Sequence, residues 1–171
     1  MDDALENVLA LLRRGVSLED AAKGLDWRAF EGVSSQIFSE NGYREFRNFR
    51  FSSKKKRYEV DIVAISMPRI ILADCKHWSL RAGKGSALKK AAEAQMRRAL
   101  EFGSKLQEFK ILGIADHEKA ILIPIIITLH EEGIAFSNGV TVVPLSRLNS
   151  FIDGVSAGLL DGIKVGIPRL Y

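Results

Sequence analysis

The chain has 171 residues, of which 47% are hydrophobic and 27% charged, a balance that predicts a folded globular domain and excludes disordered or collagen-like chains. The longest apolar stretch, residues 120–129, is about half a bilayer span, and the first residues are acidic, so we expect a soluble cytoplasmic protein with no membrane partner. A single cysteine and three scattered histidines exclude disulfide scaffolds and zinc fingers.

The net charge of +4 is unevenly distributed along the chain. Residues 44–57 and residues 76–98 each hold seven Lys and Arg against one Glu, so each segment carries +6 and the rest of the chain carries −8. Two basic stretches in an acidic body favour a polyanionic partner. Taken alone, the basic run at residues 54–57 is equally consistent with a solvated turn.

Residues 1–25 are predicted to form two short helices, the second capped by Ser17. The second helix carries two acidic residues and one lysine, a charge pattern that disfavours a DNA-reading helix-turn-helix. We therefore predict a helical appendage over residues 1–25 and the main domain over residues 26–171.

The main domain is predicted to alternate helices and strands. A helix capped by Asp26, with Trp27 on its apolar face, ends near Asn41, and a long helix spans residues 86–109. Pro124 suggests a bulge in an otherwise uniformly apolar central strand. The remaining predicted elements are strands at 46–51, 58–65, 69–76, 120–129 and 140–143, and a closing helix at 145–152. This order predicts an α/β sandwich with a mixed sheet.

Two carboxylates, Asp61 and Asp74, interrupt apolar strands. A hairpin turning between Met67 and Pro68 would place them opposite each other, about 5 Å apart at Cβ. Such a pair needs a cation, because buried carboxylates are rarely left uncompensated. Lys76, on the same face as Asp74, could neutralise one carboxylate, whereas Mg²⁺ would suit both.

These residues resemble the PD-(D/E)xK signature of the restriction-endonuclease-like superfamily, with Asp61 followed by the string Asp74-Cys75-Lys76. A preceding helix contains Glu31, and the following helix contains Gln95.

The wider pattern, which includes Gly42 and Tyr43, is most similar to Mrr-like nucleases and archaeal Holliday-junction resolvases over residues 26–153. Val60 stands where the signature has proline, and Asp74 where Glu is commoner. The resemblance implies a restriction-endonuclease-like sandwich with a central mixed β-sheet flanked by helices.

The resemblance also implies roles for individual residues. Asp61, Asp74 and the Cys75 carbonyl would hold Mg²⁺ or Mn²⁺, and Glu31 would bind it directly or through water. Lys76 would orient or deprotonate the attacking water and stabilise charge on the phosphate.

Gln95 lies on the apolar side of its helix, where a polar group needs a partner. The resemblance places it beside Lys76 or the phosphate, and a backbone hydrogen bond is the alternative. The thiol of Cys75 is expected in the core.

Nucleic-acid contacts are predicted from the basic stretches and from the residues that follow Lys76. Trp78 is equally plausible as a core anchor. The predicted contact residues are Arg44, Arg47, Lys54, Lys55, Lys56, Arg57, His77, Trp78, Arg81 and Lys84.

The resemblance therefore implies a metal-dependent DNA endonuclease that needs no small-molecule cofactor. By analogy with enzymes that cut two strands, a homodimer is expected. Two alternatives remain open: a non-cleaving nucleic-acid-binding protein of the same fold, and an RNA-processing nuclease.

Overall fold

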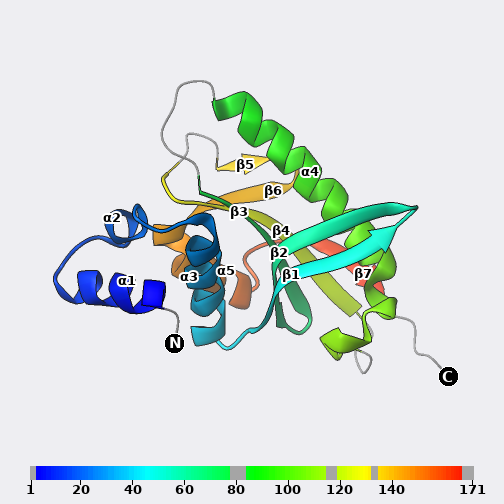
Figure 1. The fold of residues 1–171 in the computed structure, drawn as a ribbon. Coiled ribbons are helices and arrows are strands. Elements are labelled where there is room, and N and C mark those ends of the chain that lie inside the picture. Colours follow the sequence, from blue (N-terminus) through cyan, green and yellow to red (C-terminus); the bar gives the residue numbers. More distant parts are fainter. Residues whose placement is uncertain (1–2, 78–83, 115–118, 132–134, 167–171) are drawn as a thin grey trace.

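A seven-stranded mixed sheet forms the centre of the computed structural model (Figure 1), which describes residues 3–77, 84–114, 119–131 and 135–166. The strand order is β1-β2-β3-β4-β6-β5, and β7 pairs with the other end of β4. The first three strands form an antiparallel meander, whereas β3, β4 and β6 are parallel. The strands are β1 (Arg44–Ser53), β2 (Lys56–Ser66), β3 (Arg69–Lys76), β4 (Lys119–Thr128), β5 (Phe136–Ser137), β6 (Val140–Pro144) and β7 (Ile163–Gly166).

Helices cover both faces of the sheet (Figure 1). One face, with Ile70 and Leu72 of β3, packs against Phe102 of α4. The opposite face, with Ile71 and Ala73, packs against α3 and α5. The predicted sandwich with a central mixed sheet is confirmed. The helices are α1 (Asp3–Arg13), α2 (Leu18–Ala22), α3 (Trp27–Glu40), α4 (Lys84–Lys105) and α5 (Leu148–Ser156), with one-turn 3₁₀ helices η1 (Leu106–Glu108), η2 (Lys110–Leu112) and η3 (Leu145–Arg147).

The start of α3 follows from local chemistry. The carboxylate of Asp26 accepts a hydrogen bond from the backbone N–H of Ala29 at 2.8 Å, which satisfies a donor that the first turn of a helix leaves open. Gly42 takes a positive φ of 78° just after the helix, a conformation that glycine adopts without steric cost. Both ends of this helix are therefore encoded locally.

The register of the β2–β3 hairpin is the one expected from a turn between Met67 and Pro68. Ile62 pairs with Ala73 and Ser66 with Arg69. The β1–β2 hairpin closes through a two-residue turn in which Lys54 and Lys55 have φ of 48° and 64°. Side-chain-bearing residues adopt that left-handed conformation at a cost, so the turn needs support from elsewhere.

The structure corrects several predicted boundaries. Helix α4 ends at Lys105, and η1 and η2 follow, which brings the Phe109 ring within 4.9 Å of the Phe102 ring between centroids. The closing helix divides into η3 and α5. Strands β5 and β7, two and four residues long, were not predicted because such short segments carry little periodicity.

The bulge expected at Pro124 is absent from the β3–β4 ladder. Pro124 pairs in register with Leu72. On its other edge, β4 pairs with β7 up to Leu122 and with β6 from Ile125. Pro124 therefore occupies a gap between two partner strands, where a missing N–H costs no ladder hydrogen bond.

Trp27 was expected on the buried, apolar face of its helix, and this expectation is wrong. It begins α3, yet 54% of its surface is exposed, whereas Phe30 on the same helix is fully buried.

Candidate functional site

Asp74 lies near the end of β3 on the face covered by α4. Lys76 Nζ lies 2.8 Å from one oxygen of Asp74, and Arg98 Nη1 lies 3.2 Å from the other. Asp74 is buried, and both cations remain partly exposed, at 29% and 22% of their side-chain surfaces. Two cations therefore compensate the charge of one buried carboxylate.

Gln95 holds this arrangement against the sheet. Its amide nitrogen donates to the carbonyls of Leu72, at 2.7 Å, and Ile125, at 3.2 Å. Its side-chain oxygen accepts a hydrogen bond from Arg98. The alternative of a backbone partner for Gln95 is therefore observed, and the contacts link α4 to two strands and orient Arg98.

Arg98 was not among the residues predicted for the site. It follows Gln95 by three residues, so the two side chains share one helix face. That spacing, beside a buried glutamine, is the signal that could have identified it.

Asp61 marks the point where β2 separates from β3. The paired residues end at Ile62 and Ala73. Beyond them, one carboxylate oxygen of Asp61 accepts the backbone N–H of Cys75 at 2.7 Å. The side chain thus supplies an acceptor that the neighbouring strand no longer provides.

The alternation of side chains along β2 is also broken at this position. Val60 and Val63 both enter the core beneath α4, which a regularly alternating strand would not allow. Asn48, which lies opposite Asp61 in the β1–β2 register, has a positive φ of 51°. This local irregularity coincides with the point where β2 and β3 stop pairing.

Glu31 approaches the site from α3. Only 5% of its surface is exposed, and its Oε2 atom has no hydrogen-bond partner among the described residues. Burial, followed by the negative charge of Asp61, raises the pKa of Glu31 to about 7, while Arg47 acts in the opposite direction. Burial and the charge of Asp74 also raise the pKa of Asp61. We call Glu31, Asp61, Asp74 and Lys76 the carboxylate site.

Cys75 and His77 lie near the carboxylate site. Burial raises the pKa of the Cys75 thiol, so this cysteine is neutral at ordinary pH. The His77 ring meets Phe30 of α3 edge-on, with 5.4 Å between centroids. That contact uses the ring in internal packing. Trp78 and Arg81 lie outside the described residues, and Lys84 is the first residue of α4.

Several predicted nucleic-acid contacts on β1 and β2 have partners within the protein. Arg44 donates to the carbonyl of Leu112. Lys54 pairs with Glu101 of α4 at 2.8 Å, which supports the strained turn. Lys56 lies over the ring of Tyr58, 5.3 Å from its centroid.

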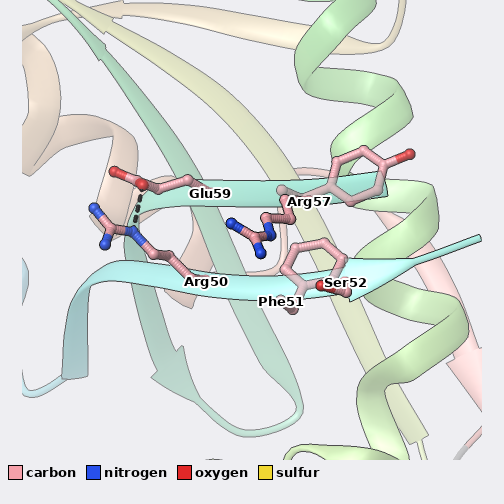
Figure 2. Close-up of a pocket in the computed structure, with 6 residues that line it drawn as sticks. Arg50, Phe51, Ser52, Arg57 and Glu59 are labelled. Carbon is pink, nitrogen blue, oxygen red and sulfur yellow. Dashed lines mark hydrogen bonds and ion pairs between the residues drawn. The ribbon is translucent and has the colours of Figure 1, made fainter. Parts of the chain in front are cut away.

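A shallow hollow of about 560 Å³ lies on the β1–β2 hairpin (Figure 2). Arg50 and Glu59 form an ion pair at 2.6 Å along one side, and the guanidinium of Arg57 turns toward them (Figure 2). Its charged groups make it suited to a polar or anionic ligand. The lining residues are Arg50, Phe51, Ser52, Arg57, Tyr58 and Glu59.

The carboxylate site has the donor chemistry of a Mg²⁺ site, in part. The Glu31 oxygen lacks a partner among the described residues, and burial and neighbouring carboxylates raise the pKa values of Glu31 and Asp61. A bound cation would stabilise the charged forms of both carboxylates. Mg²⁺ needs only one or two carboxylates, because it retains several waters. Over the parts of the chain that the structure describes, however, no three acidic, histidine or cysteine side chains are grouped at metal-binding spacing.

Comparison with known proteins gives a family, a sequence relative and a solved structure of weak similarity. The sequence model of the NERD family, described as a nuclease-related domain, matches residues 26–121. An uncharacterized protein of Archaeoglobus fulgidus is 27% identical over 126 residues, covering 74% of this chain and 88% of that protein. A crystal structure of AF1548, a protein of unknown function, aligns with a TM-score of 0.44 and 14% identity over 75% of this chain and 66% of that one.

No helix in the described ranges is long and apolar enough to cross a bilayer.

Proposed function

Because this chain belongs to the NERD family of nuclease-related domains, within the restriction-endonuclease-like fold, we propose that it is a metal-dependent endonuclease that hydrolyses phosphodiester bonds in DNA. We further propose that it acts as a homodimer in the manner of Mrr-like or junction-resolving nucleases. The observation that carries the proposal is the Asp74–Lys76 ion pair at 2.8 Å, with Asp61 on the neighbouring strand bonded to the backbone between them.

Mg²⁺ or Mn²⁺ is the cofactor in this proposal. Asp61, Asp74 and the Cys75 carbonyl would hold it, and Glu31 would bind it directly or through water. The ion would polarise the phosphate and lower the pKa of a bound water. Glu31 supports this assignment, because its buried Oε2 has no partner among the described residues and would gain one.

Lys76 is proposed to act on the attacking water and on the phosphate. Its side chain is 29% exposed, so it can reach a substrate while Asp74 fixes its position. A cation held there would orient the water and stabilise the charge that develops on the phosphate oxygens. Arg98, on the other oxygen of Asp74, would keep that carboxylate oriented throughout.

The two basic segments would bind the DNA backbone. The Lys54–Glu101 pair joins the β1–β2 hairpin to α4, the helix in which the second basic segment ends (Figure 1). Arg50 and Arg57 of the hollow would add phosphate contacts. Because each phosphate contact releases counterions, affinity should fall steeply with salt concentration.

One observation favours the alternative of a non-cleaving nucleic-acid-binding protein. Both oxygens of Asp74 are occupied by Lys76 and Arg98. If these ion pairs persist on substrate binding, Asp74 keeps its cations and no metal enters.

A cleavage assay tests the proposal. Labelled four-way junction, flap, duplex and single-stranded DNA, and an RNA of matched sequence, would be incubated with Mg²⁺, Mn²⁺ or EDTA. We expect DNA cleavage with metal and none with EDTA or with Asp74→Ala. Metal-dependent cleavage of RNA alone would establish the RNA nuclease instead. Binding of all these substrates without cleavage would establish the non-cleaving alternative.

A further inference from the structure

Trp27 is the large aromatic side chain that α3 leaves exposed. Phe30 and Phe38 of the same helix are fully buried, whereas 54% of the surface of Trp27 is open. Removing an indole ring from water is strongly favourable, so a ligand that covered the exposed surface of Trp27 would gain binding free energy. Its position therefore suggests a ligand.

One arginine lies against the indole, and a second contacts the backbone of the next residue. The guanidinium carbon of Arg28 lies 5.2 Å from the centroid of the Trp27 ring, within the range of a cation–π contact. Arg47 of β1 donates to the backbone carbonyl of Arg28 at 3.1 Å. The result is an aromatic surface accompanied by two exposed cationic side chains, one from a helix and one from a strand.

This surface lies beside the carboxylate site. Trp27 precedes Glu31 by four residues on α3, so the two side chains are neighbours on one helix face. Arg47 is also close enough to Glu31 for its positive charge to oppose the rise in the pKa of that carboxyl. The next turn of the same helix contacts His77, which directly follows Lys76.

We propose that Trp27 stacks on an unpaired nucleobase of a DNA strand held at the carboxylate site, with Arg28 and Arg47 contacting the flanking phosphates. The inference rests on the proposed function and gives it a substrate class, which is DNA with a single-stranded stretch beside the phosphate that is cut. The π-face of an exposed aromatic ring binds any base, and cationic side chains follow the backbone. Bases in an intact duplex already stack on one another and offer no free face.

Binding measurements in EDTA test the inference without any cleavage. A fluorescein-labelled single-stranded DNA, its duplex and an RNA of the same sequence would be titrated with the full-length protein. The variants are Trp27→Ala, Trp27→Phe and, as a matched loss of exposed apolar surface on η2, Ile111→Ala, since 70% of Ile111 is exposed.

We expect Trp27→Ala to weaken binding of single-stranded DNA by about tenfold or more, the scale of losing one base–aromatic stack. Trp27→Phe should recover most of that loss, because a smaller aromatic ring still stacks. Duplex affinity, and the affinity of Ile111→Ala for either DNA, should stay within about twofold. An equal loss on single-stranded and duplex DNA, or no loss on either, would overturn the inference.

Fluorescence gives a second readout. The chain has two tryptophans, Trp27 and Trp78, so a Trp78→Phe variant whose DNA affinity matches that of the wild type reports on Trp27 alone. Its emission should be quenched by single-stranded DNA and changed little by duplex. This readout stays decisive if Trp27→Ala fails to fold. Trp27-dependent binding that favours RNA over DNA would overturn the assignment to DNA.

The two proposals fail in different ways. Stacking at Trp27 by a wild-type protein that cuts nothing would contradict the nuclease and leave the inference intact. Metal-dependent cleavage with identical binding by Trp27→Ala and wild type would contradict the inference and leave the nuclease intact.

Discussion

The carboxylate site has two halves with opposite charge balance. On the α4 side, Asp74 has a cation on each oxygen, Lys76 at 2.8 Å and Arg98 at 3.2 Å. On the α3 side, Glu31 has an unpartnered oxygen and a pKa raised to about 7, and the pKa of Asp61 is raised as well. The negative charge of the carboxylate is thus paired with two cations in one half, whereas the two carboxylates of the other half have no such ion pair among the described residues.

The difference indicates where the site can accept further positive charge. A metal ion held by Asp61 and Asp74 would have to displace or share the two cations already on Asp74, and it would relieve the repulsion that burial strengthens around Glu31 and Asp61. Substitutions on the two sides should therefore have different consequences for activity and stability.

The largest effect is expected from Asp74→Asn. The amide keeps the shape of the side chain, loses the charge that pairs with Lys76 and Arg98, and makes a poor ligand for a divalent ion. We expect a loss of roughly 10³-fold or more in cleavage rate, with retained folding. Single-turnover cleavage and circular dichroism would measure the two quantities, and a fully active Asp74→Asn protein would contradict the assignment.

Lys76→Ala should separate catalysis from charge compensation. Its removal leaves Arg98 on Asp74, so stability should fall by less than the roughly 3–5 kcal/mol that follows a stranded buried charge. The cleavage rate should fall by roughly 10²-fold, the scale of losing a general base or a charge-stabilising group.

Thermal melts and DNA binding in EDTA would accompany the rate measurement on Lys76→Ala. If the variant unfolds at ordinary temperature while Arg98→Ala does not, Lys76 serves to compensate the charge of Asp74, and the catalytic role proposed for it is wrong.

Gln95→Leu tests the link between α4 and the sheet. Leucine fills a similar volume but leaves the carbonyls of Leu72 and Ile125 without this donor and Arg98 without its acceptor. We expect a loss of about 1–3 kcal/mol in the free energy of unfolding, measured by urea denaturation. An unchanged midpoint would show that these hydrogen bonds contribute little.

Glu31→Gln should have the smallest effect on the free energy of unfolding, and that effect should depend on pH. A carboxyl whose pKa rises from 4.5 to about 7 on folding binds a proton between those values, so wild-type stability should decrease as pH rises across that window. The variant should lose this slope and be more stable above pH 7, by on the order of 1–2 kcal/mol because water at the rim screens part of the charge. Melting temperatures of the wild type and the variant at pH 5 and pH 8 would measure this difference. An equal change of melting temperature with pH in both proteins would contradict the raised pKa of Glu31.

The sequence predicted the parts of the fold that depend on local signals. Asp26 and Gly42 mark the ends of α3, and the turn at Met67 and Pro68 determines which residues face each other across the β2–β3 hairpin. The order of Glu31, Asp61, Asp74 and Lys76 directed attention to the end of β3, where the structure places Lys76 against Asp74.

What the sequence could not predict depends on contacts between distant elements. Arg98 reaches Asp74 across 24 positions of sequence, and the break in alternation at Asp61 lies opposite Asn48 of another strand, which has a positive φ. Trp27 is 54% exposed, whereas its helical spacing alone indicated a core position. The roles predicted for the site residues remain predictions.

The contact between the first two helices and the rest of the protein bears on how the chain can be divided. The family match begins at residue 26, yet Val8, Ala21 and Ala22 belong to the same buried cluster as Phe30 and Leu148. Glu19 of α2 also contacts His130, which follows the strand beside β3. A polypeptide trimmed to the family boundary would therefore carry an uncovered apolar face and a buried histidine without its acid, and would be prone to aggregate.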